Sequence, residues 1–133
     1  MPDISPELDQ LSVALLKTAI DMMEAGDVLP IMLALDCSPQ LYLFEDDTPD
    51  ICYRAACNKI AEFKNECTRY VLLYDGMVQT DDNSPSEPAL LFEFAERGMS
   101  HAWSGYVLYR RAKNGEIETS DPAPAGEEEL LFG

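Results

Sequence analysis

Two segments of the chain begin with the same helix-start pattern, and they constrain the fold more than any other feature. Ser5 and Thr48 are good helix N-caps, and a proline follows each of them at the first helical position. Downstream of each cap, apolar residues recur every three or four positions, as one face of a helix requires. The pattern predicts one helix that ends near Gly26 and a second that runs to about Arg69.

Between the two predicted helices lie two short apolar runs, "VLPIMLAL" and "LYLF", separated by "DCSPQ". Turn-forming residues between runs of strand length predict a β-hairpin. Because both runs are almost continuously apolar, we expect these strands to be covered on both faces or to be central in the sheet. Pro30 has no N–H to donate to a strand ladder, so it should lie near the first strand's start or at an edge.

The remainder of the chain has the pattern of strands. "YVLLYDGMVQ" is apolar on both sides of Asp-Gly, which fits either a tight turn or a bulge within one long strand. "PALLFEF" predicts a further strand, and "YVLYRRAKNGEIET" predicts a hairpin with a type I′ turn at Asn-Gly. Residues 120–129 are expected to be a linker before the apolar tail Leu130–Phe132, for which an edge strand or a docking segment is the expectation.

The predicted order of elements is α-β-β-α-β-β-β, with one more strand if the tail pairs. This order predicts a single α+β domain over residues 1–133, an antiparallel sheet of about five to six strands that carries two helices. Hairpins join neighbouring strands, and no βαβ alternation requires a parallel sheet. The order resembles that of the profilin-like sandwich in roadblock and longin domains, a likeness of topology.

Acidic residues outnumber basic ones by 25 to 9, which gives a formal charge of −16. Nucleic acids and anionic membranes both bind through Lys and Arg, so neither is an expected partner. No apolar run reaches the roughly 20 residues that span a bilayer, and the N-terminus lacks a basic leader, so a cytoplasmic location is expected. The acidity indicates either solubility alone or a basic protein partner that is attracted electrostatically.

The four cysteines are interpreted as free thiols. Cys52, Cys57 and Cys67 fall within the predicted second helix, where the first and last would lie about 22 Å apart. A disulfide needs Cα atoms within about 7 Å, so these three should not pair with one another. Cys37 remains as a candidate partner for one of them, but buried free thiols in a reducing compartment are the expectation.

Three carboxylates between apolar runs, Asp81, Asp82 and Glu87, raise the question of a metal site. An EF-hand loop needs oxygen ligands at positions one, three and five and a glutamate at twelve. Counted from Asp81, position five is Pro85 and position twelve is Phe92, so the segment is interpreted as a polar turn. With one histidine and no Cys-x2-Cys pair, zinc is not expected either, and no cofactor is predicted.

The single histidine is the only imidazole that a nucleophilic site could use. His101 lies in "GMSHAWSG" near two serines, but the chain has no Gly-x-Ser-x-Gly elbow, so it is interpreted as a surface-loop residue. Trp103 is expected in the core, with an exposed binding anchor as the alternative. Glu93 interrupts an apolar strand and is expected on its solvent side. No catalytic residue is assigned.

These observations lead to the hypothesis of a non-enzymatic, acidic protein-binding module. Its most specific form is a bacterial immunity or antitoxin-like inhibitor that covers a basic partner such as a nuclease. One alternative is a small enzyme or small-ligand-binding domain with a pocket near His101, Trp103 and Glu93, and another is a homodimeric scaffold. The predicted partner-binding residues are Glu45, Asp46, Asp47, Asp50, Asp81, Asp82, Glu87 and Trp103.

Overall fold

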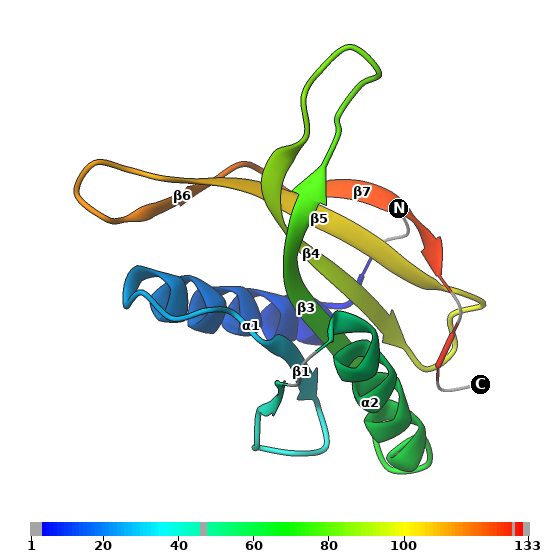
Figure 1. Cartoon of the computed structure of the whole chain (residues 1–133). Helices are drawn as coiled ribbons and strands as arrows, with labels where there is room; N and C mark the ends of the chain where they lie inside the picture. The colour runs from blue at the N-terminus through cyan, green and yellow to red at the C-terminus, as the bar shows by residue number, and fades with distance from the viewer. Residues whose placement is uncertain (1–3, 46–47, 129, 132–133) are drawn as a thin grey trace.

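The computed structural model describes residues 4–45, 48–128 and 130–131. In these residues two helices and one antiparallel sheet of seven strands form an α+β fold, as predicted, although the sheet has more strands than expected (Figure 1). No helix of the described residues is both long and apolar enough to cross a membrane.

The elements follow one another in nearly the predicted order. Along the sheet the strands are arranged β2-β1-β3-β4-β5-β6, and β7 also pairs with β5. The elements are α1 (Pro6–Glu24), β1 (Ile31–Leu35), β2 (Tyr42–Phe44), α2 (Pro49–Glu62), β3 (Arg69–Val78), β4 (Glu87–Glu96), β5 (Ala102–Arg111), β6 (Ile117–Thr119) and β7 (Ala123–Glu128).

Both helices begin where their caps predict. The Ser5 hydroxyl accepts a hydrogen bond from the backbone N–H of Leu8, and the Thr48 hydroxyl accepts one from that of Ile51. The end of α1 is also as predicted, but α2 ends at Glu62, well before Arg69. After α2 the chain continues in turns, because Cys67 is drawn into the core rather than continuing the helix.

One apolar core lies on each face of the sheet. In β3, Val71 and Leu73 pack with α1, whereas Tyr70 and Leu72 pack with α2. Successive side chains of a strand point to opposite faces, so a strand covered on both sides needs a continuous apolar run. The expectation of two covered faces is confirmed for β1 and wrong for β2, which is an edge strand with an exposed Leu43.

The Asp-Gly pair in β3 forms neither a turn nor a bulge. Asp75 pairs with Leu90 and Gly76 with Ala89 in an uninterrupted register, so β3 is one continuous strand that pairs with β4 along its whole length. A Cβ at Gly76 would lie 2.6 Å from a methyl carbon of Leu91. A larger residue here would therefore require the Leu91 side chain to move aside.

The predicted hairpin between β5 and β6 forms, but its turn type differs from the prediction. A type I′ turn needs two positive φ angles, and of the described residues here only Gly115 has one, at 90°. The N–H of Gly115 donates to the carbonyl of Ala112, whose own N–H donates to the carbonyl of Glu116. These bonds form a type I turn that is followed by a glycine in the left-handed region. In a type I turn Asn114 has a negative φ, as observed.

The segment predicted as a linker, residues 120–129, contains strand β7 in its described part. β7 pairs with β5 across Ala102–Tyr106, with a register shift between Ser104 and Gly105. The open edge of β5 offers backbone hydrogen bonds to a neighbouring segment of almost any sequence, and proline is tolerated in a strand at the outer edge of a sheet. A segment with the composition of a linker can therefore form a strand here. Leu130 and Leu131 pack against the α2-side core, and Phe132 lies outside the described residues.

Candidate functional site

A groove with a volume of about 550 Å³ opens between the segment that enters β1, the end of β2 and the start of α2. We call it the acidic groove. Its walls are mostly apolar, and its two charged lining residues are both carboxylates. The described residues that line it are Val28, Leu29, Pro30, Ile31, Phe44, Glu45, Pro49, Cys52, Tyr74 and Asp75.

One exposed large apolar side chain lines the acidic groove. It is Val28, which is 92% exposed. Leu43, Ile51 and Met77 are also exposed and lie within two positions of a lining residue along the chain, but they do not line the groove themselves. In the described part of the chain these four are all but one of the exposed large hydrophobic residues. Val28 is therefore the exposed large apolar side chain that the groove itself offers to another molecule.

Behind the groove, Glu93 is buried in a cluster with two tyrosines. It is only 5% exposed, and its two carboxylate oxygens accept hydrogen bonds from the hydroxyls of Tyr53 at 2.6 Å and Tyr74 at 2.8 Å. The expectation that Glu93 faces solvent is therefore wrong. Strand alternation places it on the α2 side of the sheet, but only the tertiary structure brings the Tyr53 side chain of α2 to it.

The tyrosines of this cluster are held in their protonated form. Burial and the Glu93 carboxylate raise the pKa of Tyr53 and of Tyr74 well above the usual range. Burial also raises the pKa of the neighbouring Tyr70, to about 12. At neutral pH the hydroxyls of Tyr53 and Tyr74 are therefore protonated and donate hydrogen bonds to Glu93. The cluster connects α2 to β3 and β4. Tyr74 belongs to the cluster and also lines the acidic groove, so its hydrogen bond to Glu93 fixes the position of its side chain in the groove wall.

The first predicted group of carboxylates lies partly at the groove. Glu45 lines it, and Asp50 is exposed in the first turn of α2, next to the lining residue Pro49. Asp46 and Asp47 lie outside the described residues. Sequence reasoning missed Asp75, because a carboxylate beside a glycine has the appearance of a turn residue.

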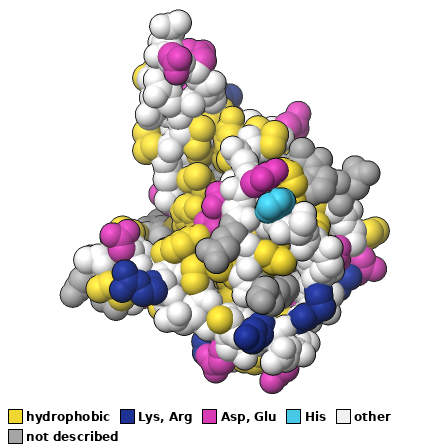
Figure 2. Space-filling view, turned by 90° about the vertical axis from the view of Figure 1, so that its right-hand side faces the viewer, with side chains coloured by type: hydrophobic (Ala, Val, Ile, Leu, Met, Phe, Trp, Pro, Cys, Tyr) yellow, Lys and Arg dark blue, Asp and Glu magenta, His cyan; other side chains and the backbone are white. Residues whose placement is uncertain are grey.

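The second predicted group lies at a different place, the tip of the hairpin that β3 and β4 form. Asp81 and Asp82 are in the turn and Glu87 begins β4, all exposed. The Asp81 carboxylate accepts hydrogen bonds from the Ser84 hydroxyl and the Asn83 backbone, which lower its pKa. The hairpin projects from the body of the molecule, with acidic side chains at its tip and hydrophobic ones below them (Figures 1 and 2).

The three residues of the alternative pocket, His101, Trp103 and Glu93, do not come together. His101 is exposed, with its Nε2 atom 3.9 Å from a carboxylate oxygen of Glu127. Trp103 is half-buried opposite Phe94 and packs against the α1-side core, whereas Glu93 lies on the other face. Trp103 is thus a partly covered core residue, as expected, rather than a freely exposed anchor.

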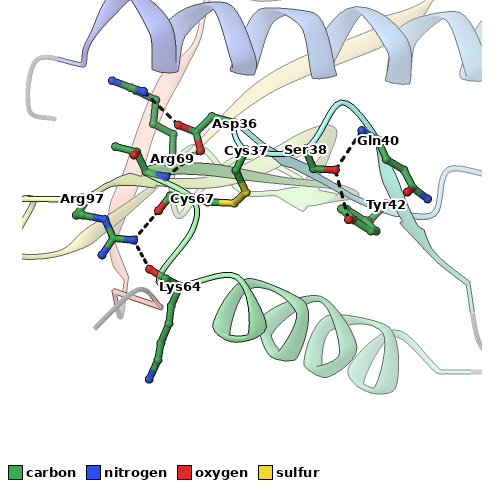
Figure 3. Close-up of a disulfide and its surroundings, with 10 residues drawn as sticks. Asp36, Cys37, Ser38, Gln40, Tyr42, Lys64, Cys67, Arg69 and Arg97 are labelled. Carbon is green, nitrogen blue, oxygen red and sulfur yellow. Dashed lines mark hydrogen bonds and ion pairs between the residues drawn. A yellow bond between two sulfur atoms is a disulfide. The ribbon is translucent and has the colours of Figure 1, made fainter.

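Cys37 and Cys67 form a disulfide, so the expectation of free thiols is wrong for this pair (Figure 3). Because α2 ends early, Cys67 lies beside the turn between β1 and β2, where its Cα atom is 4.8 Å from that of Cys37. Cys52 and Cys57 are not in disulfides. The inference of a reducing compartment from free thiols therefore has no support, since disulfides are typical of oxidising compartments.

Polar contacts hold the surroundings of the disulfide (Figure 3). One oxygen of Asp36 accepts hydrogen bonds from the backbone N–H groups of Thr68 and Arg69, and the other forms an ion pair with the Arg69 guanidinium. Asp36, Cys37 and Cys67 are close enough for a shared metal ion. Both sulfurs are bonded to each other and the carboxylate is already paired, so this group is not a metal site.

Comparison with known proteins does not assign the chain to a family. No family model, no curated protein and no solved structure matches this chain. The likeness in element order to roadblock and longin domains receives no support from these comparisons. The function must therefore be argued from the groove, the exposed apolar side chains and the charge.

Proposed function

We propose that the protein is a non-enzymatic, acidic protein-binding module whose acidic groove receives a segment of a basic partner. The observation that carries the proposal is the lining of the groove. Its walls are apolar, its charged side chains are the carboxylates of Glu45 and Asp75, and no described lining residue is positive. A concave, mostly apolar surface with a few polar groups is typical of a binding site.

The chemistry of the groove suits a lysine or arginine side chain. Such side chains have an apolar stem and a cationic end, which require an apolar wall and a carboxylate, respectively. Ile31 and Pro30 provide the wall, and the rings of Phe44 and Tyr74 offer faces that attract cations. Aromatic residues in a desolvated pocket contribute more to protein binding than most other contacts.

The charge of the whole molecule supports the same partner. Several of the nine basic side chains are already engaged within the protein. Arg69 pairs with Asp36 and Glu96, and Arg110 pairs with Glu118. The excess of carboxylates therefore produces a negative field that would attract a basic protein and speed its association, most strongly at low salt.

A bacterial immunity or antitoxin-like inhibitor is the most specific form of this proposal. A nuclease binds phosphates with a basic surface. An acidic module that occupies that surface would compete with the nucleic acid for the same cations. The acidic groove and the hairpin with Asp81, Asp82 and Glu87 would then contact the partner together.

The test is affinity capture from the host's lysate with matched baits, followed by elution with stepped salt. The groove variant is Glu45→Gln with Asp75→Asn, and the control, Glu66→Gln with Asp121→Asn, removes the same charge at exposed sites outside the groove. We expect a basic protein in stoichiometric amount on the wild type and the control, and its elution at clearly lower salt from the groove variant. If all three baits release the same proteins at the same salt, the groove is not the binding site.

A further inference from the structure

Strand β3 is paired unequally on its two sides. β4 pairs with all ten of its residues, Arg69–Val78, whereas β1 pairs only with Tyr70–Leu73. In the described part of the chain, Asp75–Val78 therefore has a strand on one side alone. In Figure 1 this part of β3 rises beyond β1 into the projecting hairpin.

The reason for the unequal pairing is local to the start of β1. Pro30 precedes β1, and a proline cannot donate to a strand ladder, so the pairing stops there. The preceding residues Val28–Pro30 are not in a strand, and they line the acidic groove opposite Tyr74 and Asp75. The groove thus occupies the place into which a longer β1 would have extended.

This edge has little of the protection that exposed strand edges usually have. Native proteins commonly guard an edge with charged side chains, especially lysine, or with proline or a bulge. In Asp75–Val78 the one charged residue is Asp75, there is no lysine or proline, and the register with β4 is regular. Instead Met77 is 59% exposed, and Val28 is exposed across the groove. An exposed edge that lacks lysine, proline and bulges and has exposed apolar side chains beside it is typical of a site that pairs with an added strand.

We propose that an extended segment of the basic partner pairs with Asp75–Val78 as an additional strand and places alternate side chains in the acidic groove. This inference rests on the proposed function. Backbone hydrogen bonds along the edge supply affinity, and the groove supplies specificity. A lysine or arginine on the added strand beside Asp75 forms a favourable cross-strand charge pair with its carboxylate, which also accepts a hydrogen bond from the Tyr109 hydroxyl. Glu45 is a second carboxylate nearby.

Charge complementarity selects this occupant over a second copy of the chain. Two copies that pair at this edge would bring the Asp75 carboxylates and two molecules of charge −16 together. Like charges across a strand pair are destabilising. The partner segment is therefore a short strand in which lysine or arginine alternates with apolar residues.

The probe is a synthetic eight-residue peptide of alternating lysine and valine, blocked at both ends. Two matched peptides carry backbone N-methyl groups, one on every lysine and the other on every valine. All three have the same charge and the same side chains. Binding to the full chain is measured by calorimetry, and hydrogen exchange reports the amides of Asp75–Val78.

We expect the unmodified peptide to bind and to slow exchange within Asp75–Val78. Alternate residues of a bound strand direct their N–H groups toward β3, so only one of the two methylation patterns blocks these donors. The peptide with that pattern should bind at least about tenfold more weakly, and the other should bind nearly as well as the unmodified peptide. Equal binding of all three would mean that charge alone holds them, so the strand pairing would be wrong while the proposed function stood. If no peptide slows exchange at this edge, the inference is wrong, and the lysate capture decides the proposed function independently.

Two variants with equal charge changes locate the contact. Met77→Lys adds a positive charge at the edge, and Val13→Lys adds one on α1 at a residue of similar exposure, 57%. Met77→Lys should weaken the unmodified peptide at least about fivefold, and Val13→Lys should match the wild type within about twofold. Equal weakening by both would contradict the site. Self-association at rising concentration, with slowed exchange at this edge, would instead identify a second copy as the occupant.

Discussion

The two halves of β3 have the same secondary structure and very different surroundings. Residues Tyr70–Leu73 have a strand on each side and a helix on each face, and all four are buried. Beyond them Tyr74 is half-buried, and Asp75 and Met77 are exposed. In sequence the two halves form one segment, "YVLLYDGMV", in which Asp-Gly lies near the change but suggests a turn or a bulge rather than a loss of neighbours.

The comparison teaches that one strand can serve two purposes. Where neighbouring elements reach it, its side chains supply stability, and where they do not, its backbone edge and side chains remain available to a partner. Regions with few buried contacts open locally at a low free energy, and ligand-binding segments are commonly found among them. The position of Pro30, which ends the pairing with β1, divides the two parts.

The largest expected difference is in the response of the two halves to truncation. Leu72→Ala removes a fully buried side chain and should lower the free energy of unfolding by about 2 to 5 kcal/mol. Met77→Ala removes an exposed side chain and should change it by about 0.5 kcal/mol or less. Urea denaturation measures both, and equal losses would contradict the division of β3.

The disulfide should stabilise the buried half from outside the strand. It joins Cys37 to Cys67 across a sequence separation of 30 residues that includes α2. Replacement of both cysteines by alanine should lower the free energy of unfolding by about 2 to 4 kcal/mol, because the unfolded chain regains the entropy of an open loop. Hydrogen exchange in Asp75–Val78 should stay unchanged under native conditions. An unfolding midpoint that resists strong reductant would argue against this role.

The boundary residue Tyr74 should show an intermediate effect. Tyr74→Phe leaves the buried carboxylate of Glu93 with one hydroxyl donor, which should lower the free energy of unfolding by about 1 to 3 kcal/mol. Tyr106→Phe is the matched control on β5, since its hydroxyl has no described hydrogen bond, and it should change stability by less than about 0.5 kcal/mol. Similar losses in both variants would mean that the Glu93 cluster contributes no more than ring packing.

The last expected effect is a pH dependence of stability that involves Asp75 in the exposed half. Burial and the hydrogen bond to Asp75 raise the pKa of Tyr109 to about 12, against about 10 in an unfolded chain. Between these values the unfolded state releases a proton that the folded state keeps, so stability should fall as pH rises from about 10 to 12. Asp75→Asn should lower the pKa of Tyr109 in a tyrosinate absorbance titration and leave that of Tyr70 near its value of about 12. An unchanged Tyr109 titration would contradict the assigned cause.

Short-range features of the fold were predictable from sequence. The caps at Ser5 and Thr48, the turn around Gly115 and the two-face covering of β1 follow from residues within a few positions of one another. The charge led to the hypothesis of a basic partner, which stays a prediction, and Glu45, one of its candidate residues, lines the acidic groove. The end of α2 was not predictable, because Cys67 leaves the helix only to meet Cys37, which is 30 residues away.

The sequence by itself determined the two helix starts, the antiparallel α+β class and the net charge, since each depends on local backbone preferences or on composition. Only the tertiary structure decided that β7 fills the outer edge of β5, that Glu93 is buried against Tyr53, and that β3 is left half open. Each of these depends on which distant segment arrives beside a strand. The sequence of a strand does not show which of its edges and faces a distant segment will cover, because the backbone groups of every strand are the same.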